Sequence, residues 1–167
     1  PETEYISAYI EARKQNNNCK NLLFFGIQAY LKKYLTQPIS KNNISQAKQI
    51  LNQHGLPFNQ KGWEYILNKH NGLLPISIEA IPEGTILPTN NILVQVVNTD
   101  PKCFWLTTYI ETSLLRAIWY PTTVATYSWN CKQIIKKYLI ETSDNLENLN
   151  FKLHDFGARG VSSFESA

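Results

Sequence analysis

Residues 75–100 have the sequence PISIEAIPEGTILPTNNILVQVVNTD, and this stretch decides the fold class. Apolar and polar residues alternate over 76–80, and an apolar run over 92–97 is bounded by Pro88 and Pro101, as is typical of strands between turns. A brief apolar segment, GTILP, lies between the two. We expect antiparallel strands here, with the last two joined through the turn PTNN.

A further strand is expected near the start of the chain. Residues 4–13, EYISAYIEAR, alternate with a period of two and place Ile6, Ala8 and Ile10 on one face. The polar stretch KQNNNCKN that follows is typical of a loop. The loop separates this strand from the helical segments further along the chain.

Helical spacing of apolar residues accounts for most of the remaining sequence. Three helices are expected within the segments IQAYLKKYL (27–35), ISQAKQILNQHG (44–55) and KGWEYILNKHNG (61–72). Asn43 is the expected cap of the second helix and Gly55 its stop. A fourth helix over 103–120 should be broken by Pro121, and a fifth should continue to about Thr142. Together with the strands, these helices predict an α+β fold.

The last residues predict the beginning of a second domain. A short strand, FKL, should end at Leu153, and a helix should start near Ser162. We therefore divide the chain into an N-terminal α/β domain, 1–148, and the first strand, loop and helix start of a further domain, 149–167. Because the sequence starts at Pro1 and contains no methionine, we expect it to be a fragment with both domains incomplete.

Composition narrows the class of protein. With 43% hydrophobic and 17% charged residues, the 167-residue chain is typical of a globular domain. The net charge of +3 is spread thinly, which argues against a nucleic-acid partner. Three separated cysteines without a CxxC motif indicate free thiols, and no run approaches the roughly 20 apolar residues of a membrane span. We expect a cytoplasmic protein with no membrane partner.

The loop KLHDFGARG, residues 152–160, is the strongest candidate for a ligand site. Loops between a strand and a helix carry the ligand groups of α/β proteins, and Ser162 with Glu165 has the spacing of a capping box at a helix start. Helix starts attract anions, and the planar Arg159 side chain suits phosphate oxygens. Phe156 would present a flat apolar face to a ring. The combination fits a ligand with an aromatic end and a phosphate end.

Structural roles for the same residues remain open. A capping box is nearly always structural, a loop arginine is often solvated, and Asp155 can hold the loop by binding its own backbone. His154 can be a hydrogen-bonded side chain that lines the loop without moving a proton. The letters DFG also occur in kinases, but the sequence lacks the glycine-rich loop, strand lysine and HRD motif of that class. The histidines show no metal-ligand spacing with each other or with a cysteine, so no metal site is predicted.

Over nearly its whole length the chain resembles the nicotinamide phosphoribosyltransferases of the type II phosphoribosyltransferase superfamily. The blocks that carry the resemblance are EYISAYIEAR, LLFFGIQAYLKKYL, KGWEYILNKHNGLLPISIEAIPEGTILP, NTDPKCFWLTTYIET, IWYPTTVAT and KLHDFGARGVSSFESA. The resemblance implies an N-terminal α/β domain with antiparallel strands that leads into an irregular α/β barrel. It implies a pentosyltransferase that joins nicotinamide to phosphoribosyl pyrophosphate, giving nicotinamide mononucleotide and pyrophosphate in NAD salvage.

The resemblance also implies partners and site residues. The family's enzymes are homodimers with shared active sites, use ATP as an assisting substrate and bind Mg²⁺ together with phosphoribosyl pyrophosphate. Phe156 looks like the aromatic residue that stacks on the nicotinamide ring, and Arg159 looks like the arginine that meets the phosphate groups. The residues expected to line the pocket and its tunnel are His154, Lys152 and Phe151.

Departures from the family pattern limit what this chain can do alone. Phe151 stands where relatives carry tyrosine, and Ala158 stands where an aromatic residue is common. No catalytic residue lies within the chain, because the family's catalytic histidine and acid are expected beyond Ala167. Alone, the chain should be inactive.

Two alternatives remain open for the function. Nicotinate phosphoribosyltransferase belongs to the same superfamily, and the accepted base is decided by groups outside this sequence. The motif HDFGxRG nevertheless favours the enzyme that uses nicotinamide, the amide. A noncatalytic binding module derived from the same domain is the other alternative. A reading frame that continues into a barrel with a catalytic histidine and acid would favour the enzyme over the module.

Overall fold

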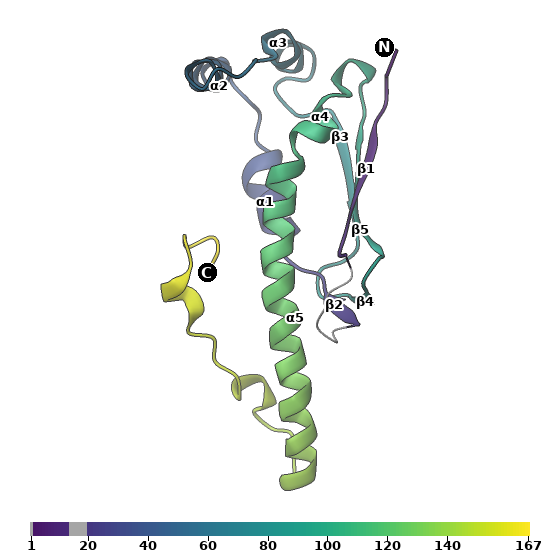
Figure 1. Ribbon diagram of the computed structural model, residues 1–167, viewed down its shortest axis with the longest axis vertical. Coiled ribbons are helices and arrows are strands. Elements are labelled where there is room, and N and C mark those ends of the chain that lie inside the picture. The colour runs from purple at the N-terminus through teal and green to yellow at the C-terminus, as the bar shows by residue number, and fades with distance from the viewer. Residues whose placement is uncertain (1, 14–19) are drawn as a thin grey trace.

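Two small antiparallel sheets packed against one long helix, α5, organise the chain, as the computed structural model shows (Figure 1). The structure describes residues 2–13 and 20–167, so the predicted loop after residue 13, with Cys19, lies largely outside the described residues. The predicted α+β class is confirmed. The strands are β1 (Ser7–Glu11), β2 (Asn21–Leu23), β3 (Ile76–Ala80), β4 (Ile86–Pro88) and β5 (Ile92–Asn98).

Strand β5 is the centre of the three-stranded sheet, whose order is β1-β5-β3. Both neighbours are antiparallel to it, with Ala8 and Ile78 both opposite Val96. Buried and exposed side chains do not alternate strictly along β5, since Leu93, Val94 and Val96 are all buried. This burial fits a central strand that is covered by helices. The predicted antiparallel arrangement is therefore confirmed for this sheet.

The second sheet corrects one expected pairing. Strand β4 pairs with β2 and not with β5, although the turn PTNN does connect β4 to β5. The reason lies in the turn itself, where the Thr89 N–H donates to the Lys20 carbonyl at 3.3 Å and the Asn90 N–H donates to the Ala12 carbonyl at 2.9 Å. The turn is thus tied to the segments beside β1 and β2, and β5 is free to pair with β1 and β3.

The predicted helices of the first half are present. They are α1 (Ile27–Tyr30), which continues as the π-helical segment η1 (Leu31–Leu35), then α2 (Lys41–Gln53) and α3 (Gln60–Lys69). Asn43 is not the cap of α2, because Ser40 accepts from the Asn43 N–H while the Asn43 side chain accepts from the Ser40 N–H. Asn43 is therefore the third residue of a capping box. Gly55, with φ of 69°, follows α2 as expected.

The second half is dominated by α5 (Glu111–Thr142), which follows the short helical segments η2 (Pro101–Cys103) and α4 (Leu106–Tyr109). Pro121 lies inside α5, contrary to the expected break. The proline leaves the Ala117 carbonyl without its usual helical partner. Gly26 packs closely at this point, since a Cβ placed on it would lie 2.5 Å from the Ala117 oxygen and 2.7 Å from Pro121 Cβ. Among the described residues no helix has the length and hydrophobicity together to cross a bilayer.

A buried stripe of α5 faces the sheets and continues through the proline. Its members lie four residues apart, at Leu114, Ile118, Thr122 and Thr126. The Thr126 hydroxyl accepts from the Leu23 N–H at 2.9 Å, and the Thr122 hydroxyl accepts from the Phe25 N–H at 3.2 Å while donating to the Phe25 carbonyl. Contacts on both sides of Pro121 therefore hold α5 as one helix.

The core lies between α5, the sheets and the helices of the first half. Its buried residues are Leu22, Phe24, Ile27, Ile66, Leu93, Val94, Val96, Cys103, Leu106, Ile110, Leu114 and Ile118. The second half of α5 extends beyond the sheets (Figure 1), and large apolar side chains there, such as Ile134 and Ile140, are exposed. Burial is thus concentrated in the first half of the helix.

The C-terminal segment differs from the expected strand and helix. Residues Leu149–Phe151 form a 3-10 turn, η3, Gly157–Gly160 form another, η4, and bends and turns follow Ser162. A strand needs a neighbour for its backbone hydrogen bonds, and this segment lies across α5 from the sheets (Figure 1). Glu165 binds Lys33 and Tyr34 instead of closing a capping box. The division of domains at residue 148 stays a prediction.

Replacing Thr122 tests the link between α5 and the segment that follows β2. Thr122→Val keeps the branched shape but removes the hydroxyl that serves both the N–H and the carbonyl of Phe25, so we expect the free energy of unfolding to fall by about 1–3 kcal/mol. Urea denaturation of Thr123→Val gives the matched control, because that hydroxyl binds only the Trp119 carbonyl of the same helix. Equal losses in the two variants would contradict the structural role of Thr122.

Candidate functional site

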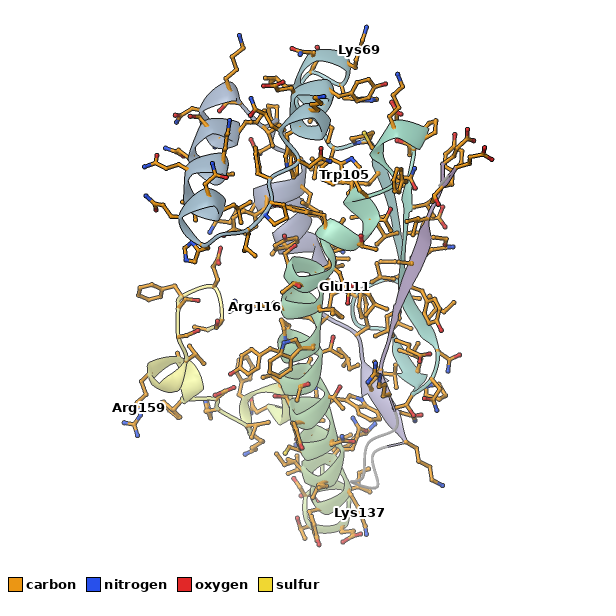
Figure 2. All side chains as sticks on the ribbon, turned by 45° about the horizontal axis from the view of Figure 1, so that its top comes forward. Lys69, Trp105, Glu111, Arg116, Lys137 and Arg159 are labelled. Atoms are coloured by element: carbon orange, nitrogen blue, oxygen red, sulfur yellow. The ribbon has the colours of Figure 1, made fainter. Side chains whose placement is uncertain are left out.

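The five residues predicted to bind substrate all lie in the exposed segment that follows α5. The exposed fraction of the residue reaches 81% for Phe156 and 71% for Phe151, and Lys152, His154 and Arg159 are also exposed. Figure 2 shows Arg159 extending from this segment away from α5. The segment therefore presents its ring and its cations to solvent.

Local hydrogen bonds shape the bend itself. Asp155 Oδ1 accepts from the Gly157 N–H at 2.6 Å, and a Cβ on Gly157 would lie 2.8 Å from the same oxygen. The proposed structural role of Asp155 is thus confirmed, and glycine fits position 157 because a side chain there would crowd the carboxylate. The rings of His154 and Phe156 lie with their centroids 6.4 Å apart and their planes at 33°. The bend brings these two rings together.

Two pockets of the described structure lie elsewhere. One, of about 490 Å³, is formed at the start of α3 by Phe58, Asn59, Gln60, Lys61 and Glu64. Another, of about 250 Å³, lies between β1 and α5, where Arg13 and Trp119 are among its lining residues. None of the five predicted residues lines either pocket. A small-molecule site normally encloses most of its ligand, and this exposed segment alone does not form such an enclosure.

A second group of reactive side chains, which the sequence analysis missed, surrounds Asp100. His70 Nε2 lies 2.8 Å from Asp100 Oδ2, and the Tyr65 hydroxyl donates to the same oxygen at 3.0 Å. The Lys102 N–H donates to Asp100 Oδ1 at 2.8 Å. Cys103, buried in the core, completes the group. Sequence spacing gave no signal, because 30 residues separate His70 from Asp100.

The surroundings of this group change three pKa values. Burial disfavours the charged form of Asp100, but hydrogen bonds from the Lys102 N–H, His70 and Tyr65 hold its pKa below the ordinary value. The hydrogen bond to Asp100 raises the pKa of Tyr65. Burial, aided by the Asp100 charge, raises the pKa of the Cys103 thiol to about 11. Asp100 is therefore charged and Cys103 protonated at neutral pH.

Comparison with known proteins now adds to this geometry. Residues 1–78 match the sequence model described as nicotinamide phosphoribosyltransferase, N-terminal domain. A nicotinamide phosphoribosyltransferase of Xanthomonas campestris pv. campestris is 48% identical over 100% of the chain, and one of Acinetobacter baylyi is 30% identical over 99%. The chain is thus similar along its whole length to part of these two proteins, and residues 1–78 are similar to the N-terminal domain of the nicotinamide phosphoribosyltransferases.

The portion is a limited part of those proteins. The chain spans 35% of the length of both relatives, so about two thirds of a nicotinamide phosphoribosyltransferase of that length has no counterpart here. The crystal structure of human nicotinic acid phosphoribosyltransferase superposes on 80% of the chain with a TM-score of 0.59 and 17% sequence identity. This likeness shows that the fold is shared with a phosphoribosyltransferase.

Proposed function

We propose that the chain is part of an enzyme that joins nicotinamide to phosphoribosyl pyrophosphate, giving nicotinamide mononucleotide and pyrophosphate in NAD salvage. The observation that carries the proposal is the 48% identity over the full chain to a relative of that name. The resemblance at KLHDFGARG, in an exposed bend, adds to it. The catalytic histidine and acid would come from outside the chain.

In this proposal Phe156 supplies one face of the nicotinamide site. The residue is 81% exposed and its ring centroid lies 6.4 Å from that of His154, which leaves an open face for a flat heterocycle. Stacking on a phenylalanine costs little conformational entropy because only two torsions have to be fixed. Phe151, Lys152 and His154 would line the approach to this ring.

Arg159 would bind the anionic end of the substrate. Transfer of the ribosyl group builds negative charge on the departing pyrophosphate, and fixed cationic donors stabilise that charge. The guanidinium offers two parallel N–H groups to phosphate oxygens, and Lys152 adds a second cation to the same exposed segment. Mg²⁺ would arrive with the phosphoribosyl pyrophosphate as part of the substrate, and ATP would assist the reaction.

A cytoplasmic homodimer with shared active sites completes the proposal. The described bend is exposed and touches neither pocket, so it needs another surface to exclude water from the substrate. A second subunit, together with the part of the protein outside this chain, would supply that surface. The dimer is therefore expected to be the active form.

Turnover of nicotinamide and of nicotinate distinguishes the proposed function from that of nicotinate phosphoribosyltransferase. We expect the purified full-length protein to have a higher kcat/KM with nicotinamide than with nicotinate, because the identity to the bacterial relatives exceeds the 17% identity to the human nicotinic acid enzyme. The product is measured by chromatography as the mononucleotide. A preference for nicotinate would favour the sibling enzyme, and binding without turnover would favour a noncatalytic module.

Phe156→Ala tests the stacking role. Loss of the ring should weaken nicotinamide binding by about 1–3 kcal/mol, the range for stacking of an aromatic side chain on a base. Calorimetric titration of the full-length protein measures this change. Phe164→Ala is the matched control, since Phe164 is fully exposed in the same segment and has no assigned role. Unchanged affinity in Phe156→Ala would exclude the stacking role.

Arg159→Ala tests the phosphate role separately. We expect the apparent KM for phosphoribosyl pyrophosphate to rise more than the KM for nicotinamide, because the guanidinium is assigned to the anionic end alone. Arg159→Lys should lie between the wild type and Arg159→Ala, since it keeps the charge but loses the planar pair of donors. Equal increases in both KM values would refute the assignment.

A further inference from the structure

Three side chains with metal-binding atoms meet at the end of the molecule away from the proposed substrate loop. They are His70, which follows α3, Asp100, which precedes η2, and Cys103, within η2. In Figure 2 the neighbouring residues Lys69 and Trp105 lie toward the opposite end from Arg159. We propose that His70, Asp100 and Cys103 bind a divalent transition-metal ion of the zinc class.

The separations of the ligand atoms fit such an ion. The imidazole nitrogen, carboxylate oxygen and thiol sulfur all lie within 4.8 Å of one another. Zinc holds its ligands at about 2.0–2.3 Å in a tetrahedron, so two ligand atoms lie roughly 3.3–3.6 Å apart. His70 Nε2 and Asp100 Oδ2, now 2.8 Å apart, would separate slightly as the metal replaces the hydrogen between them. Small side-chain movements are sufficient to form the site.

The kinds of donor select the metal. A thiolate with an imidazole and one carboxylate oxygen is a ligand set for zinc, whereas Mg²⁺ and Ca²⁺ prefer oxygen ligands throughout. Asp100 would bind through Oδ2 alone, because its Oδ1 accepts from the Lys102 N–H. Three protein ligands leave a fourth position for water.

The groups around the cluster would orient its ligands. The Tyr65 hydroxyl donates to Asp100 Oδ2 at 3.0 Å, which places it as an outer-shell partner of a metal-bound carboxylate. The Asn98 side chain donates to the Asp100 carbonyl at 2.9 Å and fixes the backbone of the same residue. Asn98 is itself buried. Asp100 is thus held in place before any metal arrives.

Metal binding has a chemical cost, which falls mainly on Cys103. The buried thiol is protonated in the metal-free protein and must release that proton to solvent as the metal–sulfur bond forms. The charge of the dication stabilises the resulting thiolate. The hydrogen on His70 Nε2 is also displaced, because the ring would bind the ion through that nitrogen and carry its hydrogen on Nδ1 instead. One metal–sulfur bond replaces the S–H bond of Cys103, so no oxidant or reductant is needed.

A bound ion would cross-link separate parts of the fold. His70 belongs to the end of α3, while Asp100 and Cys103 follow β5, the central strand of the sheet. The ion would therefore tie the α2–α3 layer to the sheet, and the expected consequence is higher stability. This role is independent of the proposed substrate loop.

Cobalt titration of the purified full-length protein tests the site. Co²⁺ bound by a thiolate gives a charge-transfer band in the near ultraviolet, which we expect to saturate at one equivalent. Cys103→Ser and His70→Gln should abolish or strongly reduce this band. The matched controls are Cys131→Ser and His54→Gln, which alter an exposed cysteine and an exposed histidine outside the cluster and should leave the band unchanged.

Zinc provides a second measurement that does not depend on colour or on enzyme activity. Competition with a chromophoric chelator should show the zinc dissociation constant rising by at least about 10–100-fold in His70→Gln, the effect expected even for loss of an outer-shell partner. Zinc should also raise the Tm of the wild type but not of His70→Gln.

Several results would overturn the proposal. They are the absence of a thiolate band in the wild type, a band that persists in Cys103→Ser, and equal zinc affinity in the wild type and His70→Gln. Circular dichroism establishes whether Cys103→Ser folds. If Cys103→Ser does not fold, His70→Gln decides the matter. This substitution changes a partly exposed side chain and leaves the buried Cys103 in place.

Discussion

The backbone of residues 23–25 is bound to one face of α5, and the rest of the structure depends on this contact. Alternate residues use opposite sides: the Phe24 N–H donates to the Thr85 carbonyl on the side of β4, while Leu23 and Phe25 donate to Thr126 and Thr122 of α5. Among the described strands β2 pairs with β4 alone, and the helix hydroxyls accept N–H groups from the other side of β2 and of the segment that follows it. This constraint explains why Gly26, which must come within van der Waals contact of Ala117 and Pro121, has no room for a side chain.

The same contact sets the position of everything that follows α5. The first half of the helix is fixed by its buried stripe, while the second half extends beyond the sheets and carries the chain to the far side of the helix (Figure 1). The loop at residues 152–160 therefore lies across α5 from both sheets (Figure 1). Glu165 then binds Lys33 and Tyr34 of η1, which connects the end of the chain back to the helices of the first half.

Local patterns were sufficient for most elements but not for their partners. Alternation over β3 and β5 and the helical spacing of α2 and α3 predicted these elements because each pattern follows from burial of one face. The pairing of β4 with β2 was missed, since it depends on backbone contacts of Thr89 and Asn90 with distant segments. Pro121 was expected to end a helix because a proline usually breaks one. The close packing of Gly26 against Ala117 and Pro121 joins distant segments, so the local sequence does not reveal it. The group around Asp100 was missed because the fold alone brings His70 to it.

The candidate loop shows a different limit of prediction from sequence. Its residues were predicted from their chemistry and from a family resemblance. In the structure the Gly157 N–H donates a hydrogen bond to Asp155 Oδ1, and the short helical turn η4 has no buried residue. Phe156 and Arg159 are consequently exposed enough to contact a ligand, but within the described part of this chain nothing encloses them as a reaction that excludes water requires. By contrast, the group around Asp100 is held by the fold of this chain itself, with Cys103 and Asn98 buried and His70 partly exposed. The geometry of the proposed metal site is therefore set within this chain, whereas the proposed substrate site would need further surfaces around the loop.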